Sequence, residues 1–339
     1  MNPYTHTRGA HRVPVLVVML ALAGGPVLAQ QEHYREREVL TPEGDTWVAA
    51  PPQTQAAPVE TLSEARRLLA LGEYKQAYKL LKKWVEANPD HERIYEATLL
   101  LGDAEFGRKR YYQAYEQYEI VTENTGGALF YKALRREMDV ARAFLAGEKR
   151  IVWKFMRLPA YDDGIEILDR IWERVPGTRM GETALKLKAD YYFEHGEMDL
   201  AQDEYANLVR EYPHGRYTKI AMLRAAEAAE AAFPGIKFDD RALLDAEVRY
   251  RQTLSQFPAY AKHEQVPQRL GGIRQLRAEK DLDIAKWYER TKHADAAEFY
   301  YRLILKDYPD TLAAEEAKAH LRGLGVGSDQ RGEAQEESS

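Results

Sequence analysis

ADYYFEHGEMDLAQDEYANLVREYP, residues 189–213, contains two small residues twelve positions apart and a proline twelve positions after the second. The small residues are Ala189 and Ala201, and the proline is Pro213. Gly196 lies between the small residues, where a glycine typically ends a first helix. The proline cannot continue a second helix. The segment therefore predicts a helical hairpin whose small residues let the two backbones approach closely.

The same spacing recurs along most of the chain. With 15 prolines among 339 residues, repeated hits at one offset are not chance. The step from one small residue to the next joins Ala65 to Ala77, Gly102 to Ala114, Ala189 to Ala201 and Ala285 to Ala297. The step from a small residue to a helix stopper joins Ala77 to Pro89, Ala114 to Gly126, Gly164 to Pro176, Ala201 to Pro213, Ala246 to Pro258 and Ala297 to Pro309.

These hairpins resemble tetratricopeptide repeats, which share the small, small, proline skeleton. One hairpin cannot bury its apolar face alone, so neighbouring hairpins must stack. The sequence predicts an all-α fold, a tetratricopeptide-type α–α superhelical solenoid of about six hairpins plus a terminal helix. The expected solenoid spans residues 58–324, with hairpins near 58–90, 91–126, 127–177, 178–214, 215–259 and 264–310 and a last helix at 311–324.

The last third of the chain resembles one particular family of repeat proteins. The repeats advance by 37 residues, as from Ala77 to Ala114, where about 34 is usual. LDIAKWYERTKHADAAEFYYRLILKDYPDTLAAEEAKAHL, residues 282–321, is similar to the ending of the BamD family of outer-membrane protein assembly factors. That resemblance implies a non-enzymatic periplasmic scaffold that binds partner proteins or peptides, among them a β-barrel assembly protein.

Both ends of the chain differ in composition from the repeats. Arg8 and Arg12 precede an apolar run that ends in Val27-Leu28-Ala29, the order of a secretory signal peptide. We expect residues 1–29 to be this signal, with cleavage after Ala29. Residues 30–57 are expected to be a disordered linker, and residues 325–339 a disordered tail.

Charge and cysteine content restrict the partners. A net charge of −6 gives no broad basic field, which argues against nucleic acid. The chain has no cysteine, whereas members of the best-known branch of the BamD family are lipoproteins. Membrane association is therefore expected to be indirect, through partners, at the periplasmic inner face of the outer membrane.

No arrangement of residues predicts catalysis. The nine histidines show no HExxH pattern, so neither a metal site nor a cofactor is expected. Asp162-Asp163 and Asp239-Asp240 precede second helices, where carboxylates favour the helix N-terminus. An envelope enzyme with a helical-repeat domain is an alternative, but the sequence leaves no second domain for it. A second alternative is an adaptor of cell-wall or division machinery, as in CpoB-type repeat proteins.

Two sets of residues are candidate binding sites. In repeats of this type the first helix of each hairpin lines the groove, and the helical register nominates Arg66, Leu69, Asp103, Phe106, Glu137 and Phe144. The second set lies in the Glu148–Ala160 insertion, which is either an elongated loop packed on the next hairpin or a docking surface for a partner or an anionic lipid headgroup. Its candidate docking residues are Lys149, Arg150, Trp153, Lys154, Phe155 and Arg157.

Overall fold

The computed structural model describes residues 38–40, 47–49, 56–152 and 156–324. The chain divides into two units, residues 1–56 and 57–339. The expected signal peptide with its cleavage at Ala29, and the expected tail 325–339, lie outside the described residues.

The first unit contains a short two-stranded sheet. Strands β1 (Glu38–Leu40) and β2 (Trp47–Ala49) pair antiparallel, with Val39 opposite Val48. Both strands fall in residues 30–57, so the expectation of a wholly disordered linker is wrong for these two stretches. Valine and tryptophan favour extended backbone, and the pairing satisfies backbone groups that a coil would leave to water.

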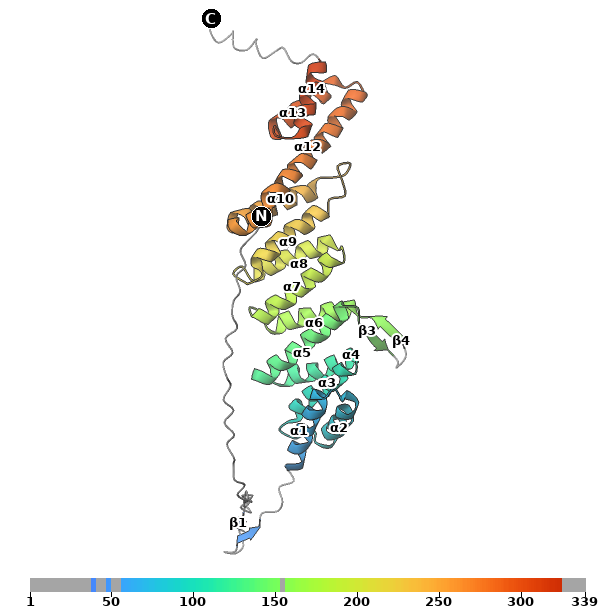
Figure 1. Ribbon diagram of the computed structural model, residues 1–339, viewed down its shortest axis with the longest axis vertical. Helices are drawn as coiled ribbons and strands as arrows, with labels where there is room; N and C mark the ends of the chain where they lie inside the picture. Colours follow the sequence, from blue (N-terminus) through green and yellow to red (C-terminus); the bar gives the residue numbers. More distant parts are fainter. Residues whose placement is uncertain (1–37, 41–46, 50–55, 153–155, 325–339) are drawn as a thin grey trace, which may run out of the picture. The chain divides into compact units, whose positions relative to one another are not determined.

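The second unit is a stack of antiparallel helix pairs, which confirms the expected tetratricopeptide-type solenoid (Figure 1). Each helix packs chiefly on the next one in the chain, as a solenoid requires. The helices are α1 (Ala56–Ala70), α2 (Tyr74–Ala87), α3 (Ile94–Gly107), α4 (Tyr111–Asn124), α5 (Gly127–Leu145), α6 (Tyr161–Arg174), α7 (Arg179–Glu194), α8 (Met198–Glu211), α9 (Thr218–Ala231), α10 (Arg241–Gln256), α11 (Pro258–His263), α12 (Val266–Arg290), α13 (Ala294–Asp307) and α14 (Leu312–Gly323).

The turns inside the hairpins share one backbone geometry. The chain becomes left-handed just after the first helix, at Gly72 (φ 75°) and at Gly196 (φ 80°). Lys109 (φ 60°) takes the same position in the second hairpin, at a conformational cost that glycine avoids. A backbone N–H then donates to the carbonyl five residues earlier, as from Arg110 to Glu105 at 2.9 Å. This hydrogen bond closes the last turn of the first helix.

The small residues of the repeat lie where the paired helices approach most closely. All those identified by the spacing of twelve are buried. At Gly102 there is no room for even one more carbon, because a Cβ would lie 2.4 Å from Cε1 of Tyr118. The spacing therefore marks helix–helix contacts, as the sequence predicts.

Enlarging one of these residues should disturb the packing of its hairpin. Ala201 is fully buried, so Ala201→Leu should overpack the contact and lower the free energy of unfolding by about 1–3 kcal/mol. Urea denaturation followed by circular dichroism measures the change. The control is Asp203→Asn, an exposed position on the same helix. Equal stabilities of the two variants would show that the helix register is wrong.

The interior of the solenoid is divided into five apolar clusters. Each cluster joins a few neighbouring helices, and the next cluster begins further along the chain. The clusters occupy α1–α3, α3–α7, α7–α9, α9–α12 and α12–α14. Among the residues that the structure describes, the packing of each hairpin is therefore shared with its neighbours alone.

The insertion in the third hairpin forms a β-hairpin. Strands β3 (Lys149–Val152) and β4 (Met156–Pro159) pair antiparallel between α5 and α6. Of the two interpretations, the elongated loop is thus replaced by a paired β-hairpin, and docking at this insertion stays a prediction. The sequence at Ile151 and Val152 favours a strand, and pairing satisfies the backbone of a segment that extends beyond the helices (Figure 1).

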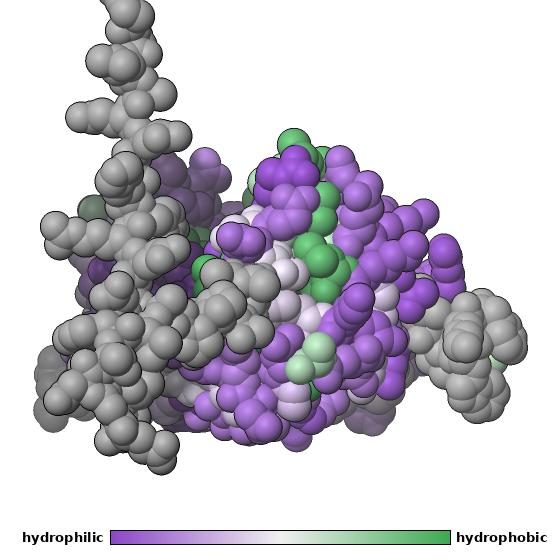
Figure 2. Space-filling view, turned by 90° about the horizontal axis from the view of Figure 1, so that it is seen from below, coloured by the Kyte–Doolittle hydropathy of each residue, from purple (hydrophilic) through white to green (hydrophobic). Residues whose placement is uncertain are grey.

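The face of the solenoid seen in Figure 2 is mostly hydrophilic. Seen from below, toward the end that carries α1 and α2, apolar residues form a narrow strip bordered by hydrophilic ones (Figure 2). Within the described part of the chain, no helix combines the length and the apolar character needed to cross a membrane.

Candidate functional site

A pocket of about 240 Å³ lies where the first helices of the first three hairpins meet. We call it the groove pocket. Helices α1, α3 and α5 contribute to it directly, and a tyrosine each from α2 and α4 completes the wall. Its lining residues are Leu69, Tyr74, Asp103, Phe106, Gly107, Tyr118, Arg136 and Asp139.

The polar side of the groove pocket is held by a carboxylate with two partners. The buried Tyr118 hydroxyl donates to Asp103 at 3.0 Å. Nε of Arg136, from the next hairpin, lies 2.8 Å from Oδ1 of Asp103. Burial, followed by the charge of Asp103, raises the pKa of Tyr118, so its hydroxyl stays protonated and remains a donor. Asp103 and Arg136 are therefore fixed in place before anything binds.

The apolar side of the groove pocket depends on a glycine. A Cβ on Gly107 would lie 2.2 Å from Cδ1 of Tyr74, so only glycine lets this ring lie against the end of α3. Phe106 packs edge-on against Tyr111, with ring centroids 5.0 Å apart. Together with Leu69, these rings give the pocket an apolar wall opposite its charged one.

Three of the predicted groove residues, Leu69, Asp103 and Phe106, line this one pocket. Arg66 lies one turn before Leu69 on α1, is partly exposed, and pairs with Glu96 of α3. These four residues remain candidates for partner contact.

The prediction is wrong for Glu137 and Phe144, whose side chains are fully buried. Phe144 belongs to the α3–α7 core cluster and packs edge-on against Tyr111. Glu137 accepts a hydrogen bond from the Thr122 hydroxyl at 2.9 Å and pairs with Arg174 at 3.1 Å. Both hold hairpins together and cannot touch a partner in this state.

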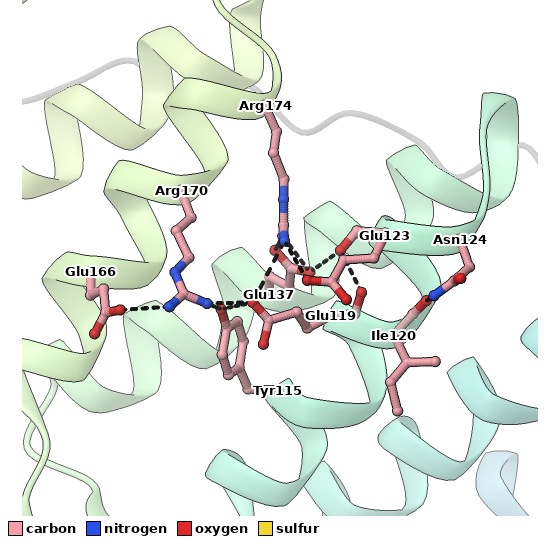
Figure 3. A network of polar contacts seen from close by, with 10 residues as sticks. Tyr115, Glu119, Ile120, Glu123, Asn124, Glu137, Glu166, Arg170 and Arg174 are labelled. Carbon is pink, nitrogen blue, oxygen red and sulfur yellow. Dashed lines mark hydrogen bonds and ion pairs between the residues drawn. The ribbon is translucent and has the colours of Figure 1, made fainter.

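Glu137 belongs to a polar network that joins α4, α5 and α6 (Figure 3). Arg170 of α6 contacts both the Tyr115 hydroxyl, at 2.8 Å, and Glu119 of α4. Arg174, one turn later, reaches Glu119 at 3.5 Å as well as Glu137. Burial raises the pKa of Glu137 to about 7, although Arg174 and Thr122 lower it. The network stabilises the packing of these three helices, because its side chains bind one another.

The link between Tyr118 and Asp103 recurs along the solenoid. Four buried tyrosines, each four residues after the small residue of a second helix, donate to a carboxylate at the end of the first helix. The pairs are Tyr118–Asp103 at 3.0 Å, Tyr205–Asp190 at 2.7 Å, Tyr250–Glu230 at 2.5 Å and Tyr301–Glu289 at 2.5 Å. This periodic tyrosine is the sequence signal that could have identified Tyr118.

Other lining residues carry no such signal. Arg136 and Asp139 reach the groove pocket from the following hairpin, and the spacing within one hairpin says nothing about that approach. Gly107 and Tyr74 meet across the boundary between the first and second hairpins. These four residues depend on how successive hairpins stack.

The insertion brings part of the second candidate set together. Arg150 pairs with Asp163 at 2.9 Å and stacks on the Tyr112 ring at 3.5 Å, which anchors the β-hairpin to the solenoid. Lys149 and Arg157 are exposed and border a second cavity, described below. The remaining candidates, Trp153, Lys154 and Phe155, lie outside the described residues.

The successive, tightly packed helix pairs define a tetratricopeptide-repeat protein. The family model of the YfiO outer membrane lipoproteins matches residues 161–323, from the first residue of α6 to the last of α14. The match covers just under half of the 339-residue chain, and the groove pocket precedes it.

The chain also matches solved structures at low sequence identity. The C-terminal part of a TPR repeat-containing protein from Cytophaga hutchinsonii is 14% identical, covers 77% of this chain and 87% of its own, and has a TM-score of 0.38. The TPR-like repeats of a kinesin light chain from Podosopora anserina are 15% identical over 59% of this chain and 98% of theirs, with a TM-score of 0.34. PilW, a type IV pilus biogenesis factor, is 14% identical over 77% and 97%, with a TM-score of 0.30. No curated protein matches the chain.

Proposed function

We propose that this protein is a non-enzymatic scaffold of the cell envelope, a BamD-like subunit in the assembly of outer-membrane β-barrel proteins. The match of α6–α14 to the YfiO outer membrane lipoproteins supports an envelope location. The chain differs from a lipoprotein in that none of its 339 residues is a cysteine. A secreted periplasmic form, held at the membrane by other means, fits both facts.

The groove pocket is the observation that carries the binding function. At about 240 Å³ it is smaller than the roughly 300–1,000 Å³ of small-molecule sites. It suits one apolar or aromatic side chain of an extended peptide. Arg136, whose side chain is 41% exposed, still has N–H groups available for a backbone carbonyl or a carboxylate beside that side chain.

The C-terminal hairpins offer a second surface for a partner. Trp287 on α12 is 50% exposed and Phe299 on α13 is 60% exposed. Large exposed aromatics are enriched where proteins bind one another. We propose that the groove pocket takes a peptide segment while these hairpins dock a second subunit.

Truncating the apolar wall of the groove pocket should remove a partner. Phe106→Ala should weaken partner binding by about 2 kcal/mol, roughly thirtyfold, because a buried aromatic anchor dominates such contacts. The measurement is quantitative mass spectrometry of proteins that co-purify with the tagged chain from solubilised envelopes. We expect a large β-barrel protein in the wild-type sample and its loss in the variant.

Two further variants make this test specific. Phe238→Ala removes a phenylalanine that is 61% exposed and far from the groove pocket, so its partners should be retained. Arg136→Gln removes the pocket's cation without opening the apolar wall, and should also weaken binding. Recovery of cell-wall or division proteins in place of a β-barrel protein would favour the adaptor function. Unchanged partners in both pocket variants would remove the groove pocket as a site.

A further inference from the structure

The two faces of the β3–β4 hairpin carry different chemistry. Residues paired across antiparallel strands share a face, and successive residues alternate between faces. Lys149 pairs with Pro159, and Ile151 with Arg157, so the two cations lie on one face. Met156 and Leu158 lie on the other face and are 37% and 43% exposed. Arg150 pairs with Leu158 on that second face, so Met156 and Leu158 lie on the face that also anchors the β-hairpin, opposite to Lys149 and Arg157.

The cationic face borders a cavity of about 440 Å³ at the turn between α3 and α4. Four cations and one carboxylate line it, which gives a local net charge of +3 in a chain whose net charge is −6. The lining residues are Arg108, Lys109, Gly147, Glu148, Lys149 and Arg157. We call these residues the basic corner.

Two cations of the basic corner are available for a ligand. Arg108 is engaged with Glu105 at 2.8 Å. Lys109 lies 3.7 Å from Glu148, so its charge offsets that of the one carboxylate in the basic corner. Among the residues that the structure describes, neither Lys149 nor Arg157 has a hydrogen-bond or ion-pair partner for its side chain, and both are exposed. Their charges therefore face solvent beside a cavity that is lined mainly by cations. Binding of an anion there would be favourable.

We propose that the basic corner and the β3–β4 hairpin dock on an anionic lipid surface. Cations beside a negative membrane bind its headgroups. Lys149 and Arg157 share one face of the β-hairpin and supply those cations. The β-hairpin extends sideways beyond the stacked helices, so a flat surface can reach it (Figure 1).

This docking gives the solenoid a direct membrane contact, independent of the proteins that the groove pocket binds. A single lysine or arginine near an anionic membrane contributes about 1 kcal/mol. Two such cations correspond to roughly a thirtyfold change in partitioning. Attachment of this strength is reversible and depends on salt.

Vesicle sedimentation with the purified full chain tests the proposal. The probes are vesicles of phosphatidylcholine alone and of phosphatidylcholine and phosphatidylglycerol in equal parts. We expect binding to the anionic vesicles only, with Lys149→Gln/Arg157→Gln lowering the partition coefficient about thirtyfold. Met156→Ser/Leu158→Ser changes the opposite face of the β-hairpin and should leave the partition coefficient unchanged.

The matched control is Lys262→Gln/Lys306→Gln, which removes the same charge from two exposed positions outside the basic corner. It should partition like the wild type, and circular dichroism should show that every variant is folded. Equal partitioning of the basic-corner variant and this control would overturn the proposal. So would release by inorganic phosphate beyond that caused by chloride at matched ionic strength, since that points to a discrete anion pocket. Vesicle binding that is unchanged in the basic-corner variant, together with a lost protein partner, would assign the corner to an acidic protein instead.

Discussion

Replacing Phe144 with alanine should lower the free energy of opening of α4, α5 and α6 by about 3–5 kcal/mol. Phe144 is fully buried in the α3–α7 core cluster. Its Cβ lies only 3.2 Å from where a Cβ on Gly164 would be, so α5 and α6 cannot move together to refill the space. Hydrogen exchange of the amides in these three helices measures the loss directly.

Phe299→Ala is the control for the loss of a phenyl ring, because Phe299 is 60% exposed. Its effect on stability should stay within about 0.5 kcal/mol. If Phe144→Ala left exchange unchanged and instead abolished partner binding, Phe144 would be a groove residue after all, and its burial would be relieved when the partner binds.

The stability of the same region should depend on the protonation of Glu137. Burial raises the pKa of Glu137 to about 7 from the ordinary value of 4.5 for a glutamate side chain. The folded state therefore binds this proton more tightly than the unfolded chain does. Its stabilisation is complete below about pH 4.5 and is lost as the pH rises to about 7, a change on the order of 3 kcal/mol.

Comparison of pH profiles checks this expectation. Glu137→Gln cannot titrate, so the difference in unfolding free energy between the wild type and this variant should fall as the pH rises through that window. Glu123→Gln changes an exposed carboxylate of the same network, with 59% of the side chain exposed, and should keep the wild-type profile. A constant difference between the wild type and Glu137→Gln would show that Arg174 keeps the carboxylate ionised throughout.

Most of the fold follows from residues that act locally. Small residues at a spacing of twelve occur because two helices cannot approach closely around a large side chain, and all of them are buried. Pro213 and Gly196 end helices through their own backbone restrictions. Such constraints repeat in each hairpin, so the sequence records them several times over.

The groove residues could be predicted only on helices whose register is fixed by the spacing of the small residues. Lys109 and Gly147 take the same left-handed position at the ends of α3 and α5. By that alignment Asp103 corresponds to Ala141, so Glu137 lies one helical turn too early and faces the interior. The insertion separates α5 from Gly164, which removes the spacing that would have shown this.

Phe144 fails for a different reason. It holds the same place before the turn as Phe106, three residues ahead of the left-handed residue. The two differ in what covers them. Both rings pack against Tyr111, but α6 also closes over Phe144, whereas Phe106 is left at the edge of the groove pocket. Whether a neighbouring hairpin covers a residue depends on how the hairpins stack. The periodicity within one hairpin does not predict it.

The division of the interior into five clusters bears on how the molecule opens. A compact core melts as a whole, but here each cluster ties together only adjacent hairpins, so a disturbance fades with distance along the chain. The terminal hairpins have a neighbour on one side only and open more readily than the middle ones. The protein can thus lose and regain order at one end of the stack while the middle hairpins stay folded.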